Sequence, residues 1–206
     1  MNQIDFIGDI HGHSEKLKAL LLKMGYTTHG KAYRHPHRKA FFVGDFIDRG
    51  PDSPEVIKIV RNMVDNGDAL AVAGNHEYNA ICFNTLTKNG YLRKHSLKNI
   101  NQHAATMKQF LPMQYEYDDM IQWFKTLPLF YESECFRVVH ATWDKTAIGY
   151  LENHTNNGVL PHEKYLELSN TSSELNKSIE VVLKGKETRL PYGKSFRDKD
   201  GTIRFD

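Results

Sequence analysis

The sequence predicts an α/β protein, because short apolar runs alternate along the chain with segments of helical spacing. The apolar runs are partly β-branched, end in polar residues and are typical of buried strands. They are IDFI (4–7), AFFV (40–43), ALAVA (69–73) and FRVVHA (136–141). Such alternation predicts βαβ units, in which the loops after the strands gather at one edge of the sheet. Functional side chains are therefore expected at that edge.

Two helices are expected between the first three strands. The segment SEKLKALLLKMGY (14–26) carries apolar residues at helical spacing on one face. These are Leu17, Leu20, Leu21 and Met24. The segment SPEVIKIVRNMVDNG (53–67) repeats the pattern, with Asp52 or Ser53 placed to cap its start and Asn66 and Gly67 placed to end it. Each helix would link one strand to the next.

Length and composition favour one domain over residues 1–206, because 206 residues with 40% apolar content suffice for one globular core. The formal net charge of +2 is too balanced to indicate nucleic-acid or membrane binding by itself. Cys82 and Cys135 lie far apart without a CxxC spacing, which suits a reducing compartment, and both are expected to be buried. With no long apolar run and no export-type start, we expect a soluble, cytoplasmic protein.

Side chains with metal-binding chemistry follow each predicted strand. The first strand is followed by Asp9 and His11, the second by Asp45 and the third by Asn75, and the fourth ends at His140. Successive members of the Asp9, Asp45 and Asn75 series are separated by about one βαβ step, so parallel strands can bring them together. Taken singly, each residue has an ordinary structural explanation as a turn or a core histidine. Taken together, they predict a metal site at the edge of the sheet.

Four ordered blocks carry a resemblance to a known family. GDIHG (8–12), GDFIDRG (44–50), GNHE (74–77) and VHA (139–141) resemble the signature blocks of the calcineurin-like metallophosphoesterases. The DRG and GNHE forms resemble the phosphoprotein-phosphatase branch, which includes bacterial diadenosine tetraphosphatases. This resemblance, over residues 4–145, implies a central β-sandwich flanked by helices, with a two-metal site.

The resemblance also implies how the metals are held. Asp9 and His11 would hold the first ion, Asp45 would bridge both ions, and Asn75 with His140 would hold the second. Carboxylate, amide and imidazole donors suit two divalent ions of manganese, iron, zinc or nickel, with manganese as the expected metal. A hydroxide bridging the two ions would then attack phosphorus directly, cleaving a phosphoester or a phosphoanhydride.

Further residues of the same blocks would act on the substrate. Arg49 has the planar, permanently charged side chain that grips phosphate oxygens, and Asn75 would contact the substrate as well. His76 resembles the family's general acid, which protonates the leaving oxygen, while Asp48 would orient its imidazole. Glu77 is expected to accept hydrogen bonds beside the site.

Residues 78–115 contain no Asp or Glu, and they follow GNHE directly. Their cations are Lys88, Arg93, Lys94, Lys98 and Lys108. We expect a helical, basic cap over about residues 78–128, which would concentrate phosphorylated substrates at the rim of the site. Arg93 and His95 are candidates for contacting the substrate beyond its reacting phosphate. An ordinary solvated helical face is an equally open interpretation.

One departure from the family pattern concerns the second metal. The family supplies a further histidine from a Gly-His block after the VHA strand, and His154 and His162 lack that context. We therefore expect a C-terminally incomplete chain, in which Asp45, Asn75, His140 and solvent hold the second ion. Missing strands would leave unpaired sheet edges.

Three functions remain open at this point. The first is a phosphohydrolase that acts on a dinucleoside polyphosphate, a phosphoprotein or another phosphorylated small molecule. The second is a weakened scaffold that binds metal and recognises phosphate without turnover. The third is a nucleic-acid end-processing phosphatase, which the lack of a stacking-aromatic pattern disfavours. No membrane partner is expected.

Overall fold

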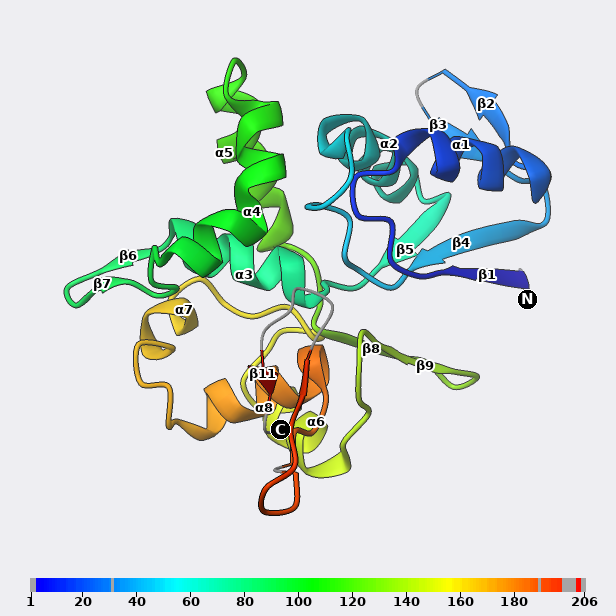
Figure 1. The fold of residues 1–206 in the computed structure, drawn as a ribbon. Helices are drawn as coiled ribbons and strands as arrows, with labels where there is room; N and C mark the ends of the chain where they lie inside the picture. The colour runs from blue at the N-terminus through cyan, green and yellow to red at the C-terminus, as the bar shows by residue number, and fades with distance from the viewer. Residues whose placement is uncertain (1–2, 31, 189, 198–202, 205–206) are drawn as a thin grey trace.

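A small parallel sheet lies at one side of the molecule, with α1 and α2, in the computed structural model, which describes residues 3–30, 32–188, 190–197 and 203–204 (Figure 1). Three strands pair in the order β1-β4-β5, and both pairings are parallel. They are β1 (Gln3–Ile7), β4 (Arg38–Phe42) and β5 (Ala69–Ala71). The sequence predicted these three strands, and the α/β class is confirmed. Their carboxyl ends meet at one edge of the sheet, as the βαβ pattern indicated.

Helices α1 (Ser14–Lys23) and α2 (Ser53–Asp65) share one core with the sheet residues that face them. The Asp52 side chain caps α2 by accepting a hydrogen bond from the Glu55 N–H at 3.2 Å. Both helices were predicted. The apolar face of α1 is narrower than expected, because Leu20 remains 40% exposed.

The other face of the sheet is covered by an antiparallel hairpin of β8 (Phe130–Glu132) and β9 (Arg137–Val139). Phe41 of β4 and Val72, which directly follows β5, are buried there against Val138 of the hairpin. The fourth predicted strand is thus present, but it belongs to this second layer. In the described part of the chain, the hairpin is all that represents the second layer of the predicted β-sandwich, and Phe6 remains 53% exposed beside it.

A mainly helical region follows β5. It contains α3 (Asn75–Asn84), a short hairpin of β6 (Leu86–Thr87) and β7 (Gly90–Tyr91), α4 (Leu97–Phe110) and α5 (Gln114–Phe124). Helix α5 packs on α3 and α4 through an apolar face. Figure 1 shows α4 and α5 rising beside α3, away from the strands.

The remaining elements complete the fold. Helices α6 (Lys145–Glu152) and α8 (Glu174–Lys184) pack together, with the short α7 (Lys164–Glu167) between them in sequence. Two more hairpins are formed by β2 (Thr27–His29) with β3 (Ala32–Arg34) and by β10 (Phe196–Arg197) with β11 (Ile203–Arg204). One buried apolar cluster runs from Ile7 to Leu183.

Two features bear on the expectations from composition. None of the helices in the described residues has the length and apolar character needed to cross a bilayer. Cys82 is buried as expected, whereas the expectation for Cys135 is wrong, because it lies exposed in the turn of the β8–β9 hairpin.

Candidate active site

The loops after the strands adopt left-handed backbone conformations where the site residues lie. His11, Asp45, Asp48 and Arg49 all have positive φ, between 47° and 69°. Such conformations are unfavourable for residues other than glycine and cluster at functional sites. Neighbouring loops hold the conformation in place, because the backbone N–H groups of Ile10 and His11 both donate to the Asp45 carbonyl, at 3.0 and 2.9 Å.

Glycines let the ends of β4 and β5 approach closely. A Cβ atom at Gly74 would lie 2.3 Å from the Asp45 Oδ1 atom, and one at Gly44 would lie 2.3 Å from the Gly74 nitrogen. Any side chain at either position would therefore force the loops apart. The glycines of the GD and GN blocks are required by this packing.

The Glu77 side chain connects the same two loops through hydrogen bonds. Its buried carboxylate accepts hydrogen bonds from the backbone N–H groups of Asp45, Phe46 and Gly74, at 2.7, 2.8 and 2.9 Å. Burial, together with the charge of Asp45, raises the pKa of Glu77 to about 7, and the N–H donors oppose this shift. The role expected for Glu77 as an acceptor beside the site is confirmed.

The Asp45 carboxylate stands at the centre of a cluster of metal-competent atoms. Its Oδ2 atom lies 3.6 Å from the Nε2 atom of His11 and 3.6 Å from the Nε2 atom of His140. The Asp9 Oδ2 atom lies 3.6 Å from the same nitrogen of His11. Among the described residues, Asp9, His11, Asp45 and His140 thus lie together. They follow the ends of β1, β4 and β9, which are far apart in sequence.

These donors fit a divalent cation. The Nδ1–H of His11 donates to the Ile47 carbonyl at 2.9 Å, so the Nε2 atom carries the free lone pair of the ring. The Nε2 atom is buried and has no hydrogen-bond partner. His140 is arranged in the same way, because its Nδ1–H donates to the Val43 carbonyl at 2.7 Å. Burial lowers the pKa of His11, which favours the neutral imidazole that metals require. Two imidazole nitrogens and a carboxylate oxygen that face one another are all acceptors and cannot hydrogen-bond among themselves. A cation between them would accept their lone pairs.

A second group of residues lies beside this cluster. The Nδ1 atom of His76 is 2.6 Å from the Asp48 Oδ2 atom, and its Nε2 atom is 3.4 Å from the Arg49 Nη2 atom. Burial works against protonation of His76, but the hydrogen bond to Asp48 and the charge of Asp45 raise its pKa. Asn75 begins α3 next to His76 and lines the same cleft.

Sequence reasoning missed the residues that hold Asp48. Its Oδ1 atom lies 2.8 Å from His103 Nδ1 and accepts a hydrogen bond from the Thr106 hydroxyl at 2.7 Å. His103 Nε2 in turn lies 2.8 Å from the Tyr117 hydroxyl, whose pKa burial raises to about 12. Burial opposes ionisation of Asp48, yet the hydrogen bonds from His103 and His76 lower its pKa. The one available signal was that His103 and Thr106 fall on the buried face of α4, three residues apart.

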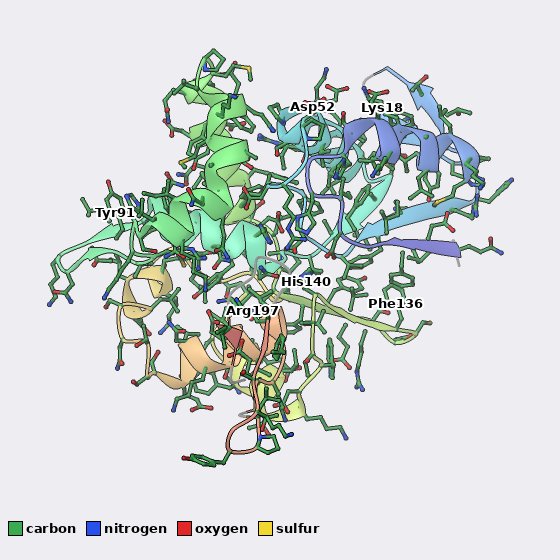
Figure 2. All side chains as sticks on the ribbon, viewed as in Figure 1. Lys18, Asp52, Tyr91, Phe136, His140 and Arg197 are labelled. Atoms are coloured by element: carbon green, nitrogen blue, oxygen red, sulfur yellow. The ribbon has the colours of Figure 1, made fainter. Side chains whose placement is uncertain are left out.

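A cleft with a volume of about 1530 Å³ opens beside these residues. Arg49, Asn75, His76 and His140 line it, and so does Arg197; Figure 2 labels His140 near the middle of the view. Five of the lining side chains are cationic and gather from several elements. They are Arg49, Arg93, Lys98, Lys184 and Arg197. The acidic lining residues are Asp48, whose carboxylate is engaged by two histidines, and Glu187.

The two candidates from the basic segment are placed differently. Arg93 lines the cleft, whereas His95 is not among the described residues that line it. The His95 ring is stacked between Phe83 and Tyr91, at centroid distances of 3.9 and 4.0 Å, and its Nε2 atom bonds the Phe83 carbonyl. The structure therefore does not bring His95 to the site.

The fold and the donor cluster together define a metal-binding α/β protein of the phosphoesterase type. A family model described as calcineurin-like phosphoesterase matches residues 3–184, and the chain belongs to this family. The family prediction is confirmed. Membership implies divalent metal ions, and the donor cluster described above is the candidate site for them.

Individual relatives agree with this assignment. The bis(5'-nucleosyl)-tetraphosphatase PrpE (asymmetrical) of Oceanobacillus iheyensis is 32% identical over 161 residues, which are 77% of this chain and 63% of that protein. The protein of the same name from Halalkalibacterium halodurans is 48% identical over 75 residues, which are 36% of this chain and 30% of that protein. The chain thus spans less than two thirds of the length of these relatives.

A solved structure supports the fold. The cold-active protein-tyrosine phosphatase of a psychrophilic Shewanella species superposes with a TM-score of 0.56 at 17% identity, over 90% of this chain and 55% of that chain. At this identity the likeness concerns the fold alone.

Proposed function

We propose that the chain is a metal-dependent phosphohydrolase that cleaves phosphoesters or phosphoanhydrides. The observation that carries the proposal is the convergence of two imidazole lone pairs, on His11 and His140, at the Oδ2 atom of Asp45. His140 of this cluster lines the cleft that Arg49 and His76 also line. Cation, phosphate clamp and proton donor are the three components that phosphoryl transfer to water requires.

In this proposal Asp9 and His11 would hold one divalent ion, Asn75 and His140 would hold the other, and Asp45 would serve both. Manganese suits the mixed carboxylate, amide and imidazole donors, and iron, zinc and nickel are alternatives. When bound, such ions act as Lewis acids on a phosphoryl oxygen and make water more acidic. The histidine Nδ1–H groups, fixed on the backbone carbonyls of Ile47 and Val43, keep each Nε2 lone pair aimed at its ion.

The chain's other residues act directly on the substrate. Arg49, whose guanidinium is exposed in the cleft, grips two phosphoryl oxygens and neutralises the charge that grows on them. His76 donates the proton on Nε2 to the leaving oxygen, because Asp48 holds Nδ1 at 2.6 Å and keeps the imidazole oriented. Asn75 is adjacent to His76 and contacts the substrate as well as its ion.

We propose a dinucleoside polyphosphate as the substrate, with a phosphoprotein as the alternative. Two relatives are named for bis(5'-nucleosyl)-tetraphosphate, and the cleft has cationic residues along its length beyond Arg49. Helices α3, α4 and α5, within about residues 78–128, would cap the site, with Arg93 and Lys98 at its rim. We assign no substrate contact to His95, because its ring is stacked between Phe83 and Tyr91 and it is not among the described residues that line the cleft. The cytoplasmic location stays a prediction.

Activity with a panel of substrates tests this function. The purified chain is freed of metal, supplied with Mn²⁺ and assayed with diadenosine tetraphosphate, a phosphopeptide and an aryl phosphate. We expect Mn²⁺-dependent hydrolysis with diadenosine tetraphosphate as the best substrate. Asp45→Asn should lower kcat/KM at least about a hundredfold, because cation binding contributes several kcal/mol to the transition state.

The matched control is Asp65→Asn, which makes the same change at an exposed carboxylate in the last turn of α2. It should leave kcat/KM within about twofold, as surface substitutions usually do. Absence of Mn²⁺-dependent hydrolysis with every substrate, or equal activity of the Asp45→Asn variant, would contradict the proposal. A preference for the phosphopeptide would support the proposed reaction but would make a phosphoprotein, and not a dinucleoside polyphosphate, the substrate.

A further inference from the structure

Arg93 is a half-buried cation whose hydrogen bonds go to neutral groups. Its Nη1 atom donates to the Asn79 Oδ1 atom at 2.8 Å, and its Nη2 atom donates to the Gln102 Oε1 atom at 2.7 Å. Among the residues that the structure describes, no carboxylate lies within ion-pair distance of this guanidinium. Half-buried charges are normally paired, because removing a charge from water is costly.

The two amides fix where the guanidinium points. Asn79 approaches from α3 and Gln102 from α4, while the backbone N–H of Arg93 donates to the Cys82 carbonyl at 3.0 Å. A guanidinium has five N–H donors in a rigid plane, so donors remain after both amides are satisfied. Arg93, Asn79 and Gln102 all line the cleft, so the remaining donors are available to a ligand there.

The position of this group relative to His76 is set by helix α3. Asn79 follows His76 by three residues, which places both on one side of the helix and about one turn, ~5 Å, apart. The Arg93 guanidinium is bonded to Asn79, while the Arg49 guanidinium lies 3.4 Å from His76, so the two arginines contact residues one helical turn apart on α3. Two of the arginines that line the cleft, Arg49 and Arg93, thus have no carboxylate partner within ion-pair distance among the described residues.

We propose that Arg93, oriented by Asn79 and Gln102, is a second phosphate-binding site for a phosphoryl group that does not react. It would favour substrates with consecutive phosphoryl groups over simple phosphate monoesters, because only the former reach both arginines. This inference rests on the proposed function, since it assigns Arg49 and His76 to the reacting phosphoryl group. The Arg93 contacts also cross-link α3 to α4, so the test must separate ligand binding from that structural role.

Substrate discrimination provides the first test. Arg93→Met retains the apolar stem and removes the charge, and the control Lys16→Met makes a similar change at an exposed lysine of α1. The ratio of kcat/KM for diadenosine tetraphosphate to that for 4-nitrophenyl phosphate is measured with Mn²⁺. We expect Arg93→Met to lower this ratio about 10- to 100-fold, as loss of a charged hydrogen bond does, and Lys16→Met to leave it unchanged. An equal loss on both substrates, or no loss on either, would overturn the inference.

Binding of inorganic tripolyphosphate provides a second test that does not require turnover. Calorimetry compares tripolyphosphate with orthophosphate, and Arg93→Met should weaken the former about 10- to 100-fold more than the latter. If the wild-type chain hydrolyses no substrate, the proposed function fails while this measurement still decides the Arg93 site. Should Arg93→Met lower the melting temperature markedly, Gln102→Ala replaces it, since this variant loosens the guanidinium and keeps the charge. Equal weakening of both anions would contradict a dedicated second site.

Discussion

At the scale of single residues, Asp48 connects the strand-end loops to the helices above them. One of its oxygens holds His76 and the other is held by His103 and Thr106. Motif order predicted the strand-end residues, because each block fixes a residue type at a fixed place after a strand. Nothing comparable marks His103, Thr106 or Tyr117, because their role depends on how α4 and α5 pack over Asp48. The position of His95 also depends on how the chain packs, because residue type and sequence proximity do not reveal that its ring stacks between Phe83 and Tyr91.

We predict that His103→Ala lowers kcat while KM changes little. His103 does not take part in the reaction under our proposal, but it positions Asp48 and through it the imidazole of His76. Loss of such a supporting contact usually costs about 10- to 100-fold. Steady-state kinetics with Mn²⁺ and diadenosine tetraphosphate measures both constants.

Two further variants complete this experiment. His162→Ala, at an exposed histidine, should behave like the wild type. His103→Gln, which keeps an N–H donor for Asp48, should recover part of the lost kcat. A rise in KM with unchanged kcat in His103→Ala would show that the residue serves substrate binding and not the orientation of His76.

At the scale of elements, the loop between β4 and α2 is held at both of its ends. Asp52 caps α2, accepts a hydrogen bond from the Ser14 hydroxyl at 2.8 Å and thereby connects the starts of α1 and α2. The cap was predictable from local sequence, because the Asp-Ser-Pro-Glu order is a common helix start. The pairing of β9 with β8 was not, because local apolar spacing does not specify the neighbour of a strand.

We predict that Asp52→Ala lowers the free energy of unfolding by about 1–2 kcal/mol, the usual cost of a lost helix cap. Chemical denaturation followed by circular dichroism measures the change. Asp65→Ala in the last turn of the same helix is the control, and it should change stability by less than about 0.5 kcal/mol. Equal effects of the two variants would contradict a specific role of the Asp52 cap.

At the scale of the whole molecule, the site lies where two layers meet. The parallel sheet supplies Asp9, His11 and Asp45, while His140 arrives at the end of β9 from the hairpin layer. Under our proposal a cation held by residues of both layers would join them, and it would bind the folded chain only, because these residues are far apart in an unfolded chain. The sequence predicted that His140 would join the cluster, but the motif order did not indicate that it would do so from the opposite layer.

We predict that Mn²⁺ raises the melting temperature of the wild-type chain and that a chelator reverses the effect. A ligand at about a thousand times its Kd stabilises the folded state by roughly 4 kcal/mol. Differential scanning calorimetry with and without Mn²⁺ measures the shift. His140→Asn should reduce the shift strongly, whereas His162→Asn should retain it, and equal shifts in both variants would show that the stabilising ions bind elsewhere.

The metal content of the purified chain tests the central claim most directly. Elemental analysis after saturation with Mn²⁺ and removal of loosely bound ions should find about two ions per wild-type chain, as a dinuclear site requires. Asp45→Asn should lose most of this metal, because its carboxylate contacts both histidine ligands. A wild-type chain with no stoichiometric metal, or an Asp45→Asn chain with undiminished metal, would contradict the account.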